Sequence, residues 1–538
     1  MAIPEMRYWG WGEDERAPAP NQALIGWLSG RLGGLGPEQP PASPGDFKEQ
    51  PTRLSRKERR RIEAIVGSGG FSTGMGDRLV HATGKSYPDI VRMRAGGRVP
   101  LPDCVVRPAS RSQVAELLSL CARRGIAVVP FGGGTSVVGG VDPDRGDHHS
   151  VISLDTGSLR SVVDVDPISR VAVLQAGLRG PEVEHELQKR GLTLGHFPQS
   201  FEYSTVGGWV ATRSAGQASS GYGRIDDLVR GLSLAAPEGE LELMARPASA
   251  AGPDLRELVV GSEGTLGVIT EVALQVAPRP EETRYEAFLF PSFAAGSEAF
   301  RALAQEEVQP DITRLSDESE TGFYLAAAGL EGTRRNLLGG YLRARGSELE
   351  GAALAILGWE GAAGSTRERR ARAMGAIRVH GGVSIGTGPG HSWAKGRFEG
   401  PYLRDELMSV GVMVETLETA TTWSNAAHLY GAVREALESH APVVGCHISH
   451  VYPTGCCLYF TFLARQEPDD LIGQWKAVKG AACEAIVAAG GTITHHHGVG
   501  ADHRRYLKKE DGKLGIGMLR SAKKRADPTG VMNPGKLL

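Results

Sequence analysis

The sequence predicts an α+β protein with more than one domain, and three observations carry that prediction. The chain has 538 residues, more than one hydrophobic core usually organises, so two or three domains are expected. Up to about residue 277, short strand-like segments alternate with helical ones, which is typical of an α+β fold. After residues 277–282, which read APRPEE, the composition shifts and longer helical patterns follow. This shift indicates a second domain.

The first part of the chain opens with residues 1–50, an irregular lead-in that is rich in proline, glycine and charge. A basic run at residues 53–61 then begins a helix, SRKERRRIEAIVG, whose charges we interpret as a solvated face rather than a membrane patch. Helices are also expected in SQVAELLSLCARRG and GPEVEHELQKRG, where apolar residues recur at helical spacing. Strands are expected in CVVRPAS, IAVVPFGGGTS, SVISLDT, VAVLQAG and LGVITEVALQV.

The second part is expected to combine strands with longer helices. RYEAFLFPS and YFTFLAR have the apolar character of strands, and FAAGSEAFRALAQEE has helical spacing. Two further helices are expected around WKAVKGAACEAIVAAGG and GMLRSAKKRADPTG. We therefore divide the chain into a partly helical N-terminal segment at 1–98, domains at 99–278 and 279–480, and a C-terminal segment at 481–538.

Composition and charge exclude several classes of protein. The formal net charge is −2, so there is no basic excess to attract nucleic acid. The start of the chain has no apolar signal-peptide core, and no stretch reaches the roughly 18 apolar residues of a transmembrane helix. The six cysteines have no zinc spacing, and the final NPGKLL is not the S-K-L peroxisomal address. We therefore expect a cytoplasmic protein.

Three loops rich in glycine and hydroxyl side chains carry the strongest functional signal. They are PFGGGTSVVGG at 130–140, a polar stretch without amphipathic period at 198–229, and VGSEGTLGVITEV at 260–272. The first is neither a Walker A loop nor a Rossmann fingerprint, because no Gly-Lys-Ser/Thr follows and no helix opens there. One glycine turn is equally compatible with a structural hairpin. Three such loops suit an extended cofactor with a pyrophosphate, because their amides can converge on an anion.

The loop sequences PFGGGTS, EYSTVGGWVATRSAG and GSEGTLGVITE resemble the FAD-binding domain of the vanillyl-alcohol-oxidase type. That resemblance implies FAD bound between two α+β subdomains at 99–278. It also implies an α+β cap domain with an antiparallel sheet at 279–480, and a C-terminal segment that completes the active site. The segments MRYWGWGEDE, TRLSDESE, PYLRDEL, ETLETATTW, GCCLYFTF, THHHGVG and DPTGVMNPGKLL further resemble the alkyldihydroxyacetonephosphate synthase family, most weakly at residues 320–395.

The resemblance also implies which residues would line the cofactor. The glycine turn offers no histidine or cysteine for attachment, so we expect FAD to be non-covalent. The implied cofactor-binding residues are Pro130, Phe131, Gly132, Gly133, Gly134, Thr135, Ser136, Gln199, Ser200, Phe201, Glu202, Tyr203, Ser204, Thr205, Thr212, Arg213, Ser214, Ala215, Glu263, Gly264, Thr265, Leu266, Gly267, Val268 and Ile269.

The reaction that the resemblance implies is an exchange without net redox. The family replaces the acyl group of 1-acyl-dihydroxyacetone phosphate with a long-chain fatty alcohol and so forms the ether bond of ether lipids. The alternative is an FAD-dependent dehydrogenase or oxidase of a 2-hydroxyacid or another alcohol. Such enzymes resemble this chain but carry H-x-G-D-G-N-x-H and E-H-G-I-G. Here His447 and His450 remain, without the Gly-Asp-Gly-Asn, and we interpret both as buried polar or substrate-wall residues.

The partners follow from the same resemblance. Both lipid substrates partition into bilayers, so we expect peripheral membrane contact, with weak support from Trp27, Leu28 and the basic run at 53–61. We also expect a homodimer.

The run Thr494 to Gly500, THHHGVG, raises the choice between a metal and an acid/base site. Successive side chains of an extended segment point to opposite faces, and the run has no acidic neighbour in sequence, so we predict no metal. A histidine with a pKa near about 6.5 suits proton transfer. The resemblance assigns catalysis to Tyr459, His495, His496 and His497, with His496 and His497 as the pair that does the chemistry. The alternative for His495 is that it only orients this pair. From the pattern alone, Tyr459 is equally compatible with an ordinary core position.

Two arginines match the family as substrate-binding residues. Arg404 in PYLRD and Arg314 in TRLSD would hold the phosphate, because a guanidinium can grip it in a bidentate way. The alternative is that each forms a structural ion pair, Arg404 with Asp405 and Arg314 with Asp317.

Overall fold

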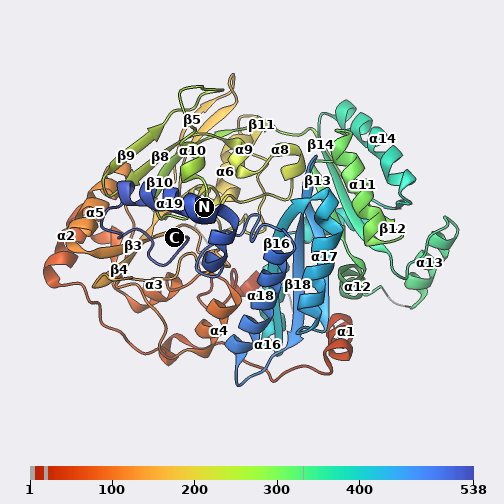
Figure 1. The fold of residues 1–538 in the computed structure, drawn as a ribbon, viewed down its shortest axis with the longest axis horizontal. Helices are drawn as coiled ribbons and strands as arrows, with labels where there is room; N and C mark the ends of the chain where they lie inside the picture. Colours follow the sequence, from red (N-terminus) through yellow and green to blue (C-terminus); the bar gives the residue numbers. More distant parts are fainter. Residues whose placement is uncertain (1–5, 17–21, 331) are drawn as a thin grey trace.

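The structure is a computed structural model that describes residues 6–16, 22–330 and 332–538. In Figure 1 most of the N-terminal half of the chain forms one side of the molecule, and the large sheet with its helices forms the other. The first helix, α1 (Gln22–Leu32), lies on the side of the large sheet, and the last, α19 (Arg504–Ala526), lies on the opposite side. Three sheets and one short two-stranded pair organise these residues. None of the described helices is long and apolar enough to cross a membrane.

A four-stranded sheet in the order β1-β2-β4-β3 contains the first glycine-rich loop at its edge. The three longer strands pair in parallel, and helix α5 connects β2 to β3. Ser110 caps the start of α5 through its side chain, and Gly125 ends it in the left-handed region. The bounds are β1 (Phe71–Ser72), β2 (Cys104–Val106), β3 (Ile126–Phe131), β4 (Ser150–Asp155) and α5 (Arg111–Arg124).

The edge of β3 is not left open. Val128 donates its amide to the carbonyl of Val531 at 2.8 Å and accepts the amide of Asn533 at 2.8 Å. Residues 531–533 therefore extend the sheet beside β3, although about four hundred residues separate the two segments in sequence.

A five-stranded antiparallel sheet follows, in the order β5-β6-β10-β8-β9. Between β6 and β8 we expected a long loop at 198–229, and this is wrong in part, because three short helices form there. Thr205 caps α7 by accepting the amide of Gly208, and Trp209 and Val210 anchor that helix in the core. The bounds are β5 (Val162–Asp166), β6 (Val171–Gln175), α6 (Gly180–Gln188), β7 (Leu192–Thr193), α7 (Val206–Thr212), α8 (Ser219–Tyr222), α9 (Ile225–Leu228), β8 (Val229–Ala236), β9 (Gly239–Leu243), α10 (Arg256–Val259) and β10 (Val268–Gln275).

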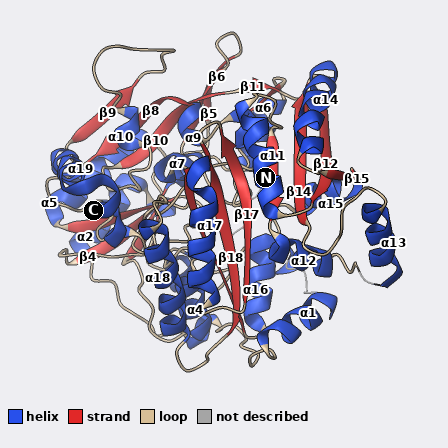
Figure 2. Cartoon of the chain, turned by 45° about the vertical axis from the view of Figure 1, so that its right-hand side comes forward, coloured by secondary structure: helices blue, strands red, loops and turns tan. Residues whose placement is uncertain are grey.

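A seven-stranded antiparallel sheet dominates the second half, in the order β15-β12-β14-β13-β17-β18-β16. Helix α17 packs on this sheet and α18 packs on α17, as Figure 2 shows. The strands are β11 (Ala277–Pro278), β12 (Glu282–Phe290), β13 (Ile312–Ser316), β14 (Ala353–Gly361), β15 (Val383–Gly386), β16 (Val412–Thr422), β17 (Val443–Tyr452) and β18 (Gly455–Arg465), of which β11 pairs with β7. The helices are α11 (Phe293–Gln305), α12 (Glu318–Ala327), α13 (Gly332–Arg343), α14 (Ala363–Val379), α15 (Gly388–Gly396), α16 (Gly400–Ser409), α17 (Trp423–Glu438), α18 (Leu471–Ala488) and α19 (Arg504–Ala526).

The N-terminal lead-in is more ordered than predicted. Helix α1 (Gln22–Leu32) forms within the segment expected to be irregular, because Leu24, Leu28 and Leu32 share one face and are buried against α16, β16 and β18. The neighbouring Trp27 packs on Phe323 of α12. Three further helices complete this part: α2 (Arg56–Val66), α3 (Met75–Val80) and α4 (Tyr87–Ala95).

Candidate active site

A cavity lies beside the loop that follows β3. Residues from six separate parts of the sequence build its wall, including all three glycine-rich loops. The lining residues are Pro130, Phe131, Gly132, Ser136, Val138, Gly140, Val141, Thr156, Gly207, Gly208, Ala211, Thr212, Glu263, Gly264, Gly267, Val268, Ile269, His497 and Asn533.

The glycines of the first loop are required by a close approach of two loops. A Cβ on Gly132 would lie 2.3 Å from Oγ1 of Thr205, and one on Gly133 would lie 2.1 Å from the carbonyl oxygen of Tyr203. The amide groups of residues 132–136 donate to no group of the described residues. Free successive amides on a tight loop are what a phosphate-bearing cofactor needs.

Asn533 gives a second sign that a ligand belongs in this cavity. Its side-chain nitrogen donates to the carbonyls of Gly140 at 3.1 Å and Glu263 at 2.7 Å, which ties the C-terminal segment to two of the loops. Asn533 lines the cavity, and its buried Oδ1 has no partner within the described residues. The cavity therefore fits a polar cofactor such as FAD.

Only part of the predicted cofactor set lines this cavity. Several of the others have partners within the protein instead. Tyr203 bonds the hydroxyl of Tyr402 at 2.9 Å, and Arg213 pairs with Asp226 and Glu257. The predicted residues that line the cavity are Pro130, Phe131, Gly132, Ser136, Thr212, Glu263, Gly264, Gly267, Val268 and Ile269. The lining residues that the sequence did not predict are Val138, Gly140, Val141, Thr156, Gly207, Gly208, Ala211 and Asn533.

Three adjacent strands of the large sheet carry a row of functional side chains. In the register of β16, β18 and β17, Glu418 lies opposite Tyr459, and Tyr459 lies opposite His447. Residues directly opposite one another share a face of the sheet. The rings of His447 and Tyr459 accordingly stack, with centroids 4.7 Å apart.

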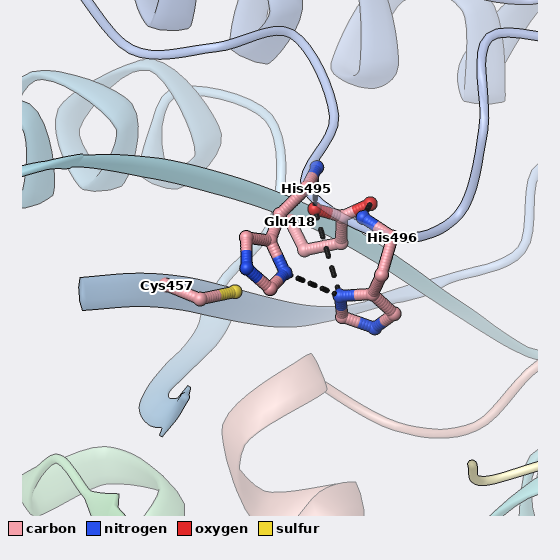
Figure 3. Close-up of side chains that lie close together, drawn as sticks. All are labelled: Glu418, Cys457, His495 and His496. Atoms are coloured by element: carbon pink, nitrogen blue, oxygen red, sulfur yellow. Dashed lines mark hydrogen bonds and ion pairs between the residues drawn. The ribbon is translucent and has the colours of Figure 1, made fainter. Parts of the chain in front are cut away.

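Glu418 holds the histidine run by its backbone. Its carboxylate accepts the amides of His495, His496 and His497, of which the last two lie at 3.2 and 2.8 Å, and the hydroxyl of Thr494 at 2.6 Å. Figure 3 shows Glu418 lying against this segment. Burial alone would raise the pKa of Glu418, but the three histidines and the Thr494 hydroxyl hold it well below its usual value. The run is thus a nest of amides around one carboxylate.

Glu263 holds the other end of the same segment. Its carboxylate accepts the amides of Val499 at 2.6 Å and Gly500 at 2.7 Å, and the residue also lines the cofactor cavity. Burial raises its pKa to about 7, against these two hydrogen bonds. One carboxylate on the cofactor side and one on the large sheet therefore fix the histidine segment at both ends.

Fixing the backbone sends the three imidazoles in different directions. His497 lines the cofactor cavity, His496 stacks on Tyr459 with centroids 6.1 Å apart, and His495 bonds the hydroxyl of Tyr452 at 2.7 Å. The rings of His495 and His496 are joined through their Nδ1 atoms at 2.9 Å. Burial lowers the pKa of all three, to about 3 for His497, so they are neutral near pH 7.

The group in Figure 3 bears on the question of a metal. Ligand atoms of Glu418, Cys457, His495 and His496 lie within 4.8 Å of one another. Our premise that the run lacks an acidic neighbour is therefore wrong in space, although it holds in sequence. The carboxylate already accepts four donors, however, and the facing nitrogens of the two imidazoles bond each other. Hydrogen bonds account for the group, and the absence of a metal stays a prediction.

Arg314 lies at the far end of the same row. Its guanidinium contacts both ring nitrogens of His447 at 3.1 Å, Glu320 at 3.1 Å and the hydroxyl of Tyr324 at 2.9 Å. His447 also bonds Glu320 at 2.8 Å. The alternative ion pair with Asp317 is not formed, because Asp317 pairs with Arg434.

Arg404 lies elsewhere, beside the N-terminal segment. It pairs with the adjacent Asp405 at 3.0 Å, as the structural alternative predicted, and donates to the carbonyl of Lys85 at 2.7 Å. The amide of Lys85 in turn donates to the carbonyl of Ser136, in the first glycine-rich loop. Whether Arg404 and Arg314 both hold the phosphate stays a prediction.

Comparison with known proteins gives first a class and then a family. Residues 102–244 match the FAD binding domain, and residues 279–537 match the C-terminal domain of FAD linked oxidases. The chain is a flavoprotein of this class and binds FAD. It is 33% identical over 513 residues to the alkyldihydroxyacetonephosphate synthase of Trypanosoma brucei brucei, which covers 93% of this chain and 81% of the relative. The chain belongs to the alkyldihydroxyacetonephosphate synthase family.

Another relative and two solved structures support the same family or fold. The synthase of Dictyostelium discoideum is 33% identical, over 86% of this chain and 77% of its own length. A solved alkyldihydroxyacetonephosphate synthase structure superposes with a TM-score of 0.83 at 28% identity, covering 98% of this chain and 99% of the other. A p-cresol methylhydroxylase, with a TM-score of 0.69 at 14% identity, covers 89% of this chain and 96% of its own and supports the fold alone. The predicted fold class, family and FAD cofactor are confirmed.

Proposed function

We propose that this protein exchanges the acyl group of a 1-acyl-dihydroxyacetone phosphate for a long-chain fatty alcohol, without net redox. The observation that carries the proposal is the histidine segment fixed between Glu263 and Glu418. It sets His497 against the cofactor cavity and His496 against Tyr459. One imidazole therefore lines the cofactor cavity, and the next lies against a phenol that can donate a proton.

The residues of this chain have distinct tasks in such a reaction. Bound FAD would supply a nucleophilic ring nitrogen for the reacting carbon. Burial raises the pKa of Tyr459 well above its usual value, so its phenol is protonated and can donate to a departing carboxylate. His496 and His497 are neutral, and a neutral imidazole both donates and accepts a proton.

The two arginines differ in what they can offer the substrate phosphate. Glu320 already neutralises Arg314, whose contacts hold the ring of His447 on Tyr459. Arg404 lies beside Asp405, but its Nη2 is buried and makes no hydrogen bond of good geometry within the described residues. Arg404 is therefore the better candidate for the phosphate, and Arg314 for positioning the tyrosine.

The direct test is product formation. Purified holoprotein given palmitoyl-dihydroxyacetone phosphate and labelled hexadecanol should yield a labelled ether lipid. Candidate 2-hydroxyacids should not bleach the flavin absorption band. Bleaching by a hydroxyacid, together with no ether product, would show a redox enzyme instead.

We also infer that the protein contacts membranes through α13. This helix exposes Leu337 by 69% and Tyr341 by 39%, with Arg334, Arg335 and Arg343 also exposed. A basic helix with exposed apolar side chains suits an anionic lipid surface. Two of the residues first considered for this role do not support it, because Leu28 is fully buried and Trp27 packs on Phe323, whereas the basic run at 53–61 is largely exposed.

Vesicle co-sedimentation tests the membrane surface. Leu337→Asp should weaken binding to vesicles that contain phosphatidylglycerol, because it places a negative charge on the docking face. Ile168→Asp is the matched control, since Ile168 is 94% exposed but lies in the first half of the chain. Equal binding by both variants would rule out α13.

We further propose that the protein is a homodimer in the cytoplasm. Light scattering coupled to gel filtration measures the mass, which should be twice 57.2 kDa. Fractionation of cells that express the chain tests its location.

A further inference from the structure

Three side chains form a hydrogen-bonded chain that the proposed reaction has not yet used. The hydroxyl of Tyr452 lies 2.7 Å from Nε2 of His495, and Nδ1 of His495 lies 2.9 Å from Nδ1 of His496. Both ring nitrogens of His495 are thus engaged. Tyr452 ends β17 and is half-buried, next to the exposed Pro453 and Thr454.

The bonding pattern has two equivalent states, because each bond needs one donor and one acceptor. If Tyr452 donates, His495 donates in turn through Nδ1 to His496, and the proton of His496 lies on Nε2. If Tyr452 accepts, every proton in the chain lies on the other atom, and Nε2 of His496 carries a lone pair. All three groups stay neutral in both states.

The proposed reaction needs such a route. Replacing the carboxylate of an ester by an alcohol releases one proton per turnover at neutral pH, because the carboxylic acid product ionises. That proton arises in a buried site, where the side chain of His496 is 14% exposed. A charge stranded there would be costly, so the proton must leave.

We propose that Tyr452 and His495 form a relay that carries protons between His496 and solvent. This inference rests on the proposed function. A proton arrives at Nε2 of His496, and the proton on its Nδ1 passes to Nδ1 of His495. The proton on Nε2 of His495 passes to the oxygen of Tyr452, whose own proton leaves to water. No other co-reactant is required.

The surroundings keep this chain in place. Glu418 fixes the backbone of His495 and His496, so their rings hold the contact. His450 stacks on His495 with centroids 5.1 Å apart, but its Nδ1 bonds the hydroxyl of Ser219 at 2.6 Å. His450 therefore supports the relay without joining it. The hydroxyl of Tyr452, to which the Arg224 side chain also donates, is its outer end.

The test is Tyr452→Phe, which keeps the ring and removes the hydroxyl. We expect kcat to fall about tenfold or more, with KM and flavin binding unchanged and a larger solvent isotope effect on kcat. Imidazole added to the buffer should restore part of the loss, because a small proton carrier can replace the hydroxyl. His495→Gln, which breaks the inner link, should show the same isotope effect.

Tyr430→Phe is the matched control. Tyr430 is also half-buried, and its hydroxyl bonds Asp317 and Arg434 away from the histidines. A kcat and isotope effect for Tyr452→Phe equal to those of Tyr430→Phe would overturn the relay, and so would a loss that imidazole does not restore. Failure of the proposed function is seen separately, as a wild-type protein that makes no ether product.

Discussion

At the scale of single residues, buried carboxylates explain the site better than the histidines do alone. Glu418 accepts three successive amides and a hydroxyl, and Glu263 accepts two more amides. The three imidazoles keep their positions because these hydrogen bonds fix the backbone of the histidine segment. Glu418 and Glu263 are thus positioning residues for the histidine segment.

Glu418→Gln should separate positioning from cofactor binding. The amide group cannot accept on its nitrogen side, so at least one backbone donor is left unpaired, which costs about 1–3 kcal/mol. We expect a lower midpoint of thermal unfolding and a large loss of turnover, with flavin absorbance retained. Loss of flavin on purification would contradict this prediction.

Glu263→Gln gives a pH dependence whose sign follows from the raised pKa. The folded pKa of Glu263, about 7, exceeds its unfolded value, so its contribution to stability is greatest at low pH and is lost as pH rises to about 7. The change is about 1.4 kcal/mol per pH unit in that window. The difference in thermal midpoint between wild type and Glu263→Gln should therefore shrink between pH 5 and pH 7. A constant difference would mean that Glu263 stays ionised throughout.

The sequence predicts some of these residues better than others. Tyr459 and the three histidines follow from the family resemblance, and the structure brings them together. The role of Glu418 could not be predicted, because its bonds go to backbone amides more than seventy residues away and such contacts leave no periodic pattern. Its place in ETLETATTW, a segment that resembles the family, was the only available signal.

At the scale of elements, the predictions of secondary structure fail where tertiary contacts override weak local patterns. Helix α1 was expected to be irregular because glycine and proline surround it, yet three leucines on one face anchor it. Helix α7 lies in a glycine-rich stretch and depends on the Thr205 cap. Among the longer elements, α5, α11, α18, β12 and β18 were predicted, because their pattern is set by burial on one face, whereas α14, α17, β14, β16 and β17 were not predicted.

Gly133→Ala tests the approach of the first glycine-rich loop to residue 203. A methyl group would lie 2.1 Å from the carbonyl oxygen of Tyr203, so the two loops must separate and the amides for the cofactor must shift. We expect flavin to be lost during dialysis and the thermal midpoint to fall. Gly431→Ala is the control, because Gly431 lies in α17 with nothing within 4 Å, and alanine should be neutral or stabilise by about 0.5–1 kcal/mol. Retained flavin in Gly133→Ala would show that the loop can adapt.

At the scale of the whole molecule, the histidine segment links the two halves of the chain. Glu263 belongs to the half that builds the cofactor cavity, and Glu418 belongs to the seven-stranded sheet. The two-part α+β architecture and the antiparallel sheet could be predicted from pattern and resemblance. The link through the histidine segment could not be predicted from the sequence, since it depends on how the two halves pack against each other.

Binding of FAD should therefore change the rate of hydrogen exchange in the histidine segment. FAD bound beside the loop that carries Glu263 should stabilise the hydrogen bonds that the amides of Val499 and Gly500 donate to Glu263. Hydrogen exchange of these two amides should therefore be slower. Comparison of apoprotein and holoprotein by mass spectrometry checks this. Helix α14, which packs on α11 and β14 and contributes no residue to the cavity lining, serves as an internal control. Equal exchange of residues 499–500 in both forms would show that the segment is rigid without FAD.

The strand-like pairing of residues 531–533 with Val128 has a consequence for synthesis. While a ribosome is still extending the chain, β3 has an open edge and the cavity lacks the Asn533 wall. Residues 531–533 must leave the ribosomal exit tunnel before either is closed, so the cofactor site is completed only at that late stage of synthesis. A nascent chain of this protein therefore carries an unprotected sheet edge for most of its elongation, which is where a chaperone would act.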